Sequence, residues 1–346
     1  MMTSRERMLA AMRNQPVDRL PCGPFGIGGL TFDDPLAQEL ILKTDCFLKT
    51  RAAGNPVLGG RAAVDVAECD GETVWTLHTP RGDLVRRIGH TEVARATREY
   101  PLKTLDDIEK LFSVPYEEPM IDATAYIGMK HRYDDDAIVL CDIGNAVAVP
   151  ADWFGPEMFC YFWATARERI IELTQRMNER VCRFVARCCE RGVTDFRIVG
   201  GEYVSVQIGP AGMPELIRGP DRKLIDIIHA HGGIAFYHNH GPMMRFLEDY
   251  AHIGVDFLEP LEAPPWGDVH LGRAKEIIGD RFCMVGNLDD MEIVNKFDAD
   301  AVCEIARQRI AEAGTRGFIL SGTSSGTFTE KGARNFIAMA ESVSRS

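Results

Sequence analysis

The sequence predicts a distorted (β/α)8 TIM barrel of the α/β class, and three observations predict it. From about residue 137, near-continuous apolar runs alternate with helical patterns, as in parallel strands buried on both faces. The six runs from there on and two candidate strands near 19–25 and 56–68 together supply eight strands. No G-x-G-x-x-G motif follows the first strand, which disfavours an open dinucleotide-binding sheet.

The N-terminal part predicts a helix and a hairpin added to the barrel. Residues 3–14 begin with Thr3 and carry Glu6 three positions later, which is a capping-box pattern. Residues 71–89 alternate at Val74, Thr76 and His78, pass through a Pro-Arg-Gly turn and continue with Leu84 and Val85, which is the pattern of a β-hairpin. We expect one domain over 1–346, with the hairpin elaboration inside 19–136.

The later elements follow one another in a regular order. Strands are expected at 137–145, 194–202, 232–241, 254–262, 281–289 and 317–326. Helices are expected at 156–190, 214–231, 242–253, 269–279, 299–314 and 330–345. This alternation is typical of parallel βα units.

Composition narrows the classes of function. The chain has 346 residues, 45% of them hydrophobic, and a net charge of −12. This charge argues against nucleic acid or an anionic membrane surface as the main partner. No apolar run approaches the roughly 20 residues that cross a bilayer, and the first residues predict an amphipathic helix rather than a signal peptide. We therefore expect a cytoplasmic protein, whose ten cysteines, without C-x-x-C, need form no disulfides.

Polar residues gather where the expected strands end. In a barrel the active site lies at the carboxyl ends of the strands, so these side chains are expected to converge on one mouth. They are Asp142, Asn145, Glu202, His238, His240, Glu259, Glu262, Asn287, Asp289, Asp290, Ser321 and Thr323.

His238 and His240 are the most informative pair. Residues i and i+2 of a strand point to the same side, so both imidazoles are expected to face the barrel axis. Two nitrogens near one point can begin a zinc site, and Glu202 or Glu262 could be the third ligand. The alternative is that one histidine caps a helix or bonds a carbonyl while the other is solvated.

The loops after the later strands supply further candidates. Pro264 and Pro265 force an extended path, which could hold Glu262 over the mouth. Trp266 could form a wall there for an aromatic substrate. The alternative is a structured loop whose acids are solvated. Asn287 follows Gly286, which would let backbone approach a ligand. Small residues at 321–326 could form an anion-binding turn or an N-cap.

Several stretches together resemble the uroporphyrinogen decarboxylase superfamily over nearly the whole chain. They are "SRERMLAAMRNQPVDRLP", "ETVWTLHTPRGDLVR", "EYPLKTLDDIEKL", "HAHGGIAFYHNHG", "GVDFLEPLEAPPWGDVHLGRAKEIIGDRFCMVGNLD" and "GFILSGTSSG". The resemblance implies a distorted (β/α)8 barrel with one of two chemistries: cofactor-free decarboxylation of porphyrinogen acetates, or methyl transfer involving corrinoids.

Two departures from the superfamily's motifs choose between these chemistries. True decarboxylases carry an arginine-rich segment where this chain has "PCGPFGIGGL", which contains no arginine to receive the substrate's carboxylates. Thiol methyltransferases carry His-x-Cys and a late cysteine, whereas this chain has His238, His240 and "SGTSSG". A site of histidine and glutamate suits an oxygen-bound substrate better than a sulfur-rich zinc site does.

The resemblance therefore implies a demethylating methyltransferase. It would pass a methyl group from a small, aromatic ether or amine to a corrinoid on a separate protein, because "DVHLG" (268–272) is one residue short of a corrinoid-binding motif. His238, His240 and Glu202 would hold zinc, or His240 would donate a proton without metal. The expected catalytic residues are His240, Glu262, Asp142 and Asn287, and the expected substrate-binding residues are Trp266, Tyr237, Ser321 and Thr323.

Two other functions stay open from the sequence. One is a metal-free decarboxylating lyase in which Asp142 or Glu262 guides protonation. The other is a non-catalytic barrel that binds a small ligand. A homodimer is compatible with the sequence.

Overall fold

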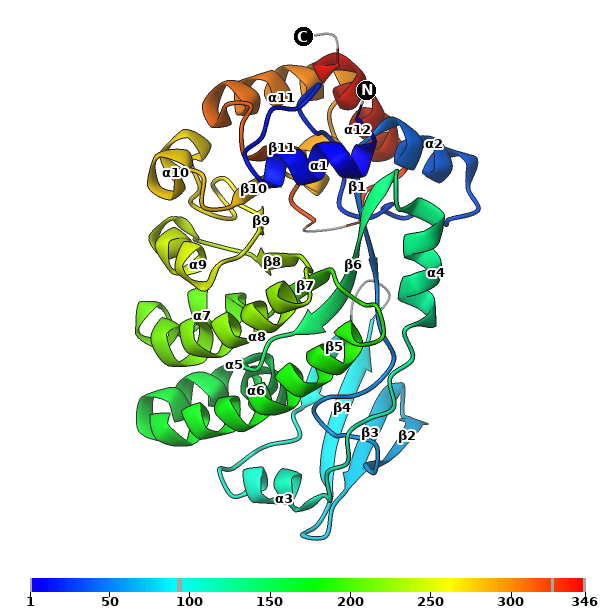
Figure 1. Ribbon diagram of the computed structural model, residues 1–346. Coiled ribbons are helices and arrows are strands. Elements are labelled where there is room, and N and C mark those ends of the chain that lie inside the picture. Colours follow the sequence, from blue (N-terminus) through cyan, green and yellow to red (C-terminus); the bar gives the residue numbers. More distant parts are fainter. Residues whose placement is uncertain (1, 92–94, 325–326, 345–346) are drawn as a thin grey trace.

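The computed structural model describes residues 2–91, 95–324 and 327–344. Ser325 and Gly326 of the expected turn 321–326, and Arg345 of the last expected helix, lie outside the described residues. Figure 1 shows helices around the outside of a curved parallel sheet, with a smaller antiparallel sheet at the bottom of the view.

Seven parallel strands form most of the barrel wall in the described part of the chain. They pair in the order β1-β6-β7-β8-β9-β10-β11. Their bounds are β1 (Cys46–Thr50), β6 (Ala137–Gly144), β7 (Phe196–Val199), β8 (Ala235–Asn239), β9 (Phe257–Pro260), β10 (Cys283–Leu288) and β11 (Phe318–Gly322). The strands β6 to β11 lie within the six apolar runs, so these predictions are confirmed.

An irregular segment takes the eighth place in the wall. Cys22 forms a parallel bridge to Leu320 in β11, and Phe25 forms one to Phe47 in β1. The backbone N–H of Gly23 donates to the carbonyl of Leu320 at 3.1 Å. Prolines at 21 and 24 lack the N–H that a ladder needs, so the strand expected near 19–25 is reduced to two bridges. The barrel is distorted, as predicted.

The strand expected near 56–68 is wrong as a barrel strand. That place belongs to β1, and residues 63–69 instead begin an antiparallel sheet. The sheet has the order β2 (Ala63–Cys69), β3 (Glu72–His78), β4 (Leu84–His90) and β5 (Arg95–Glu99). The hairpin predicted at 71–89 is confirmed by the antiparallel pair β3–β4. β2 is largely exposed, as a peripheral strand can be but a buried barrel strand cannot.

Helices cover the outside of the barrel and one end of it. Their bounds are α1 (Ser4–Met12), α2 (Pro35–Lys43), α3 (Asp107–Ser113), α4 (Thr124–Tyr133), α5 (Ala148–Thr165), α6 (Arg167–Cys189), α7 (Glu202–Ser205), α8 (Gly219–Ala230), α9 (Leu247–Ile253), α10 (Leu271–Ile278), α11 (Ala299–Ala313) and α12 (Glu330–Val343). The expected helix 156–190 is two helices, because Ala166 leaves helical geometry between α5 and α6. The capping box of Thr3 and Glu6 is confirmed. Over the described residues, no helix has the length and apolar character to cross a bilayer.

The barrel interior has its own apolar core. Partners in a parallel register point to the same side of the sheet. The inward set includes Phe47, Ile138, Leu140, Phe236, Phe257, Cys283, Val285 and Ile319, and it packs against Met8 and Ala11 of α1. Helix α1 therefore closes the amino end of the barrel, while a larger apolar cluster fills the layer between sheet and outer helices.

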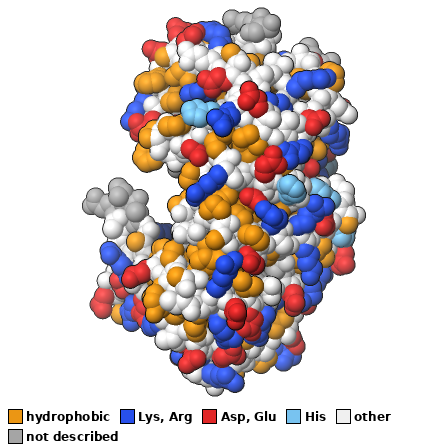
Figure 2. All heavy atoms as spheres, turned by 90° about the vertical axis from the view of Figure 1, so that its left-hand side faces the viewer, with side chains coloured by type: hydrophobic (Ala, Val, Ile, Leu, Met, Phe, Trp, Pro, Cys, Tyr) orange, Lys and Arg blue, Asp and Glu red, His pale blue; other side chains and the backbone are white. Residues whose placement is uncertain are grey.

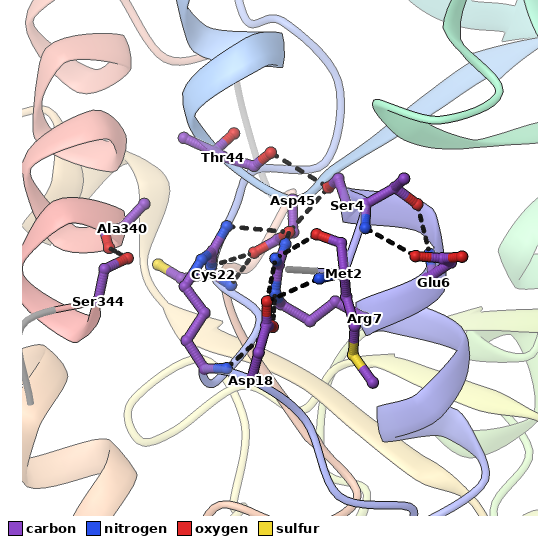
Figure 3. Close-up of polar contacts among 12 residues, drawn as sticks. Met2, Ser4, Glu6, Arg7, Asp18, Cys22, Thr44, Asp45, Ala340 and Ser344 are labelled. Atoms are coloured by element: carbon purple, nitrogen blue, oxygen red, sulfur yellow. Dashed lines mark hydrogen bonds and ion pairs between the residues drawn. The ribbon is translucent and has the colours of Figure 1, made fainter.

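A buried ionic network fixes this amino end (Figure 3). Asp45 precedes β1 and is fully buried. Its carboxylate accepts hydrogen bonds from Arg7 at 2.7 Å, Arg19 at 2.6 Å, Ser4 at 2.8 Å and the backbone N–H of Cys22 at 2.8 Å. Helix α1, the irregular segment and β1 are thus joined through one side chain.

The outer surface carries mixed charges on the face drawn in Figure 2. Lysine and arginine side chains are interspersed there with aspartate and glutamate rather than gathered into one patch. On the described part of that face, charges of both signs are mixed, so no extended region of one sign is present to attract an oppositely charged partner.

Candidate active site

Each of the seven strands turns one charged or polar side chain toward the barrel axis near its carboxyl end. We call these residues the carboxyl-end set: Lys49, Asp142, Arg197, His238, Glu259, Asn287 and Ser321. Glu259, for example, lies two positions after the core residue Phe257, so it faces the same side. Register pairs Asp142 with Arg197, His238 with Glu259, and Asn287 with Ser321. The barrel core is thus capped by a polar layer.

His238 is paired with a carboxylate in the neighbouring strand. Its Nδ1–H donates to Oε2 of Glu259 at 2.5 Å, and both side chains are buried. Burial alone would raise the pKa of Glu259, but the charge and hydrogen bond of His238, helped by Arg197, hold that pKa below its ordinary value. The buried carboxylate of Glu259 therefore holds the imidazole of His238 in one orientation.

His240 is paired in the same way at the edge of the mouth. Its Nδ1–H donates to Oε1 of Glu262 at 3.0 Å, and the other oxygen of Glu262 accepts from the backbone N–H of Gly241 at 2.8 Å. Burial works to lower the pKa of His240, but the hydrogen bond and charge of Glu262, with the charges of Glu259 and Glu202, raise it overall. His240 is 33% exposed, so a protonated imidazole here can reach a ligand.

The two imidazoles lie side by side. Their ring centroids are 4.5 Å apart and their planes are nearly perpendicular, at 89°. This is the shared rim that the i, i+2 spacing predicts. Each Nδ1 is used by a carboxylate, and the described part of the chain supplies no hydrogen-bond partner for either Nε2.

The zinc site predicted from His238, His240 and Glu202 is not formed. No group of three or more His, Cys, Asp or Glu among residues 2–91, 95–324 and 327–344 is arranged to hold a metal ion. Strand β7 ends at Val199, and two glycines turn the chain so that Glu202 begins helix α7. The acids that bond the histidines are Glu259 and Glu262, and Glu202 contributes only its charge to His240.

Two adjoining cavities open beside this pair. One, of about 460 Å³, is lined by His240, Glu262 and Trp266. The other, of about 420 Å³, is lined by Glu262 and Trp266 again and by Asn287 and Thr323. The structure therefore brings these five predicted residues together. Trp266 is 61% exposed and forms a wall of both cavities.

Asp142 lies elsewhere on the rim. Its carboxylate accepts a hydrogen bond from Arg197 at 3.4 Å, and it lines a different cavity of about 380 Å³. Ser321 is fully buried and its hydroxyl has no partner in the described structure. Both residues face the axis, but neither lines the cavities beside His240.

Tyr237 is placed away from the cavities. It alternates with the inward Phe236 and His238, so its ring points outward into the layer beneath the helices. Its hydroxyl donates to Asp221 at 2.6 Å and accepts from the side-chain amide of Asn145 at 3.1 Å. A substrate-binding role does not fit this fully buried position.

Arg197 and Lys49 are functional candidates that the sequence analysis missed. Arg197 interrupts the apolar run "DFRIVG", and a charged residue inside an expected buried strand is the signal that marks it. Lys49 could not be found, because β1 itself was not predicted.

Comparison by sequence gives no match to a family model or to a curated protein. Among solved structures, the chain is similar to a methyltransferase from Methanosarcina mazei, with a TM-score of 0.66, 14% identity and 99% of each chain covered. A B12-independent methionine synthase from Shewanella sp. overlaps with a TM-score of 0.42 at 10% identity, over 81% of this chain and 74% of the other.

A putative vitamin-B12 independent methionine synthase from Listeria monocytogenes overlaps with a TM-score of 0.38 at 14% identity, over 64% of this chain and 67% of the other. These last two scores are too low to carry an argument. The likeness to the Methanosarcina protein shows a shared fold along the whole chain, and it confirms the distorted barrel that the sequence and its superfamily resemblance predict.

Proposed function

We propose that this protein is a methyltransferase that removes a methyl group from a small ether or amine and passes it to a corrinoid bound by a separate protein. The observation that carries the proposal is the His240–Glu262 pair on the wall of a cavity that Trp266 also lines. The shared fold with a methyltransferase supports it.

The residues of the site suit removal of a methyl group from oxygen. The carbon–oxygen bond of the ether breaks, the methyl group goes to the acceptor, and the oxygen keeps the electron pair. His240 gives its Nε2 proton to that oxygen as general acid, and the raised pKa of His240 favours the protonated imidazole that this role needs. The bound corrinoid would supply the nucleophile.

Other side chains hold this geometry. Glu262 orients the imidazole through Nδ1 and stabilises its protonated form. His238 packs edge-on against His240 and is itself fixed by Glu259, so we assign it a positioning role. Trp266 offers a flat apolar wall for an aromatic substrate.

The test is a demethylation assay with His240→Gln, since glutamine cannot act as a general acid. Loss of general-acid catalysis lowers kcat by roughly 10²- to 10⁴-fold. We would follow methylation of reduced free cobalamin by its absorbance, with methoxyphenols as methyl donors. The control is His252→Gln, an exposed histidine near the end of α9.

Two results would reject the proposal in different ways. Parent-level turnover by His240→Gln would remove His240 from the mechanism. A folded parent protein that demethylates no ether or amine in the panel would reject the methyltransferase assignment itself.

A further inference from the structure

Two cations lie beside one aromatic ring at the barrel mouth, in the lining of a cavity separate from the one that His240 lines. The Arg197 guanidinium carbon is 4.6 Å from the centroid of the Phe25 ring, and Nζ of Lys49 is 5.8 Å from it. Both residues belong to the carboxyl-end set, one in β7 and the other in β1. Both also line a cavity of about 200 Å³.

Arg197 has unused hydrogen-bonding capacity in a buried position. The residue is 9% exposed, and its Nε is buried without a partner in the described structure. Among the described residues, its one hydrogen bond is the long contact to Asp142, at 3.4 Å. A guanidinium has five N–H donors, and burying a charge without satisfying it is costly. The Arg197 guanidinium can therefore donate a hydrogen bond to a further acceptor, such as a ligand.

Lys49 adds a second positive charge to the same cavity. Within the described residues it forms no ion pair, although the chain as a whole is acidic. Phe25, Ile27, Phe32 and Leu48 supply the apolar part of the remaining wall, which also contains Ser324 and Thr327. Two cations beside a group of apolar side chains favour an anion that is attached to an apolar body.

We infer that Arg197 and Lys49 form a carboxylate-binding subsite for a small apolar, aromatic-type acid. The planar fork of Arg197 matches a carboxylate, and Lys49 adds a mobile point charge. The subsite does not rest on the proposed methyl transfer, because its occupancy is measured as binding without turnover.

The experiment is calorimetric titration of the full-length protein with benzoate, and with benzamide as its uncharged counterpart. We expect the parent to bind benzoate at least tenfold more tightly than benzamide. Lys49→Met is expected to weaken benzoate binding roughly tenfold, the value of one charge-assisted contact, and to leave benzamide binding unchanged. Because Lys49 is exposed, this variant keeps the fold.

Lys43→Met is the matched control, since it removes one lysine charge at the end of α2, before the buried Asp45. It should bind benzoate as the parent does. Arg197→Gln should abolish the preference for benzoate, with folding checked by circular dichroism. Equal binding of benzoate and benzamide by the parent, no binding of benzoate, or parent-like benzoate affinity in Lys49→Met would overturn the subsite.

Discussion

Asp45 and Asp290 are two buried aspartates at opposite ends of the same barrel. Asp45 lies before β1 at the amino end, where two arginines, a serine and a backbone N–H all donate to its carboxylate. Asp290 follows β10 at the carboxyl end, and its Oδ1 is buried without a partner in the described structure. Burial, with the nearby charge of Glu259, raises the pKa of Asp290 to about 8.

Other buried side chains at the carboxyl end share this feature of Asp290. At the carboxyl end, the side chains of Arg197, Asn287 and Ser321 also contain a buried polar atom that lacks a partner among the described residues. Buried polar groups are ordinarily satisfied, and exceptions gather where a ligand or water completes them. The network around Asp45 is therefore built for stability, whereas the carboxyl end keeps polar atoms available for binding and chemistry.

The largest expected effect is on stability at the amino end. Asp45→Ala leaves Arg7 and Arg19 without their shared acceptor, and breaking a buried ion pair costs about 3–5 kcal/mol. Denaturant unfolding at pH 7 measures the loss. Asp33→Ala, which removes an exposed carboxylate, should stay within about 0.5 kcal/mol of the parent. If Asp45→Ala lowers the free energy of unfolding by less than about 1 kcal/mol, the Asp45 network does not stabilise the amino end as the comparison requires.

Replacing Asp290 at the carboxyl end should raise the free energy of unfolding, whereas replacing Asp45 at the amino end lowers it. Asp290 has a folded-state pKa of about 8 against an ordinary 3.8, so its folded form keeps a proton that its unfolded form has lost. Its contribution to stability is complete below about pH 4 and falls as the pH rises toward 8. Asp290→Asn cannot ionise and should match the parent at pH 4 but exceed it at pH 8, by roughly 1–3 kcal/mol.

The measurement is the free energy of unfolding of both proteins across this pH range. Asp221 also has a pKa raised by burial, to about 7, but it is present in both proteins and cancels in the difference. A constant difference between the two curves would show that Asp290 is ionised in the folded protein.

The sequence predicts the repeating strand–helix units of the barrel. The strands β6 to β11 are found because apolar runs of strand length end in polar residues and alternate with helices. β1 is missed because "CFLKT" is short and ends in lysine and threonine, and residues 21–26 are distorted by prolines. Local pattern does not show which short segment closes a barrel.

The site shows the same limit at the level of single residues. The period of two places His238 and His240 on one rim correctly. The same period turns Tyr237, which lies between Phe236 and His238, to the outer side of the strand. Glu202 falls inside the strand expected at 194–202, but that strand ends three residues earlier, at Val199. The pairing of each histidine with an acid depends on register between strands, which one sequence does not specify.

The smallest expected effect separates stability from function at the carboxyl end. Ser321 is fully buried, and its hydroxyl lacks a partner among the described residues. Removing an unsatisfied hydroxyl gives up no hydrogen bond, so Ser321→Ala should change the free energy of unfolding by less than about 1 kcal/mol, toward greater stability. Thr174→Ala is the control, because its hydroxyl is equally buried but donates to the carbonyl of Ile170 at 2.9 Å, and it should destabilise. If Ser321→Ala loses as much stability as Thr174→Ala, the hydroxyl of Ser321 is satisfied in the folded protein, and the carboxyl end is less open to ligands than the comparison with Asp45 indicates.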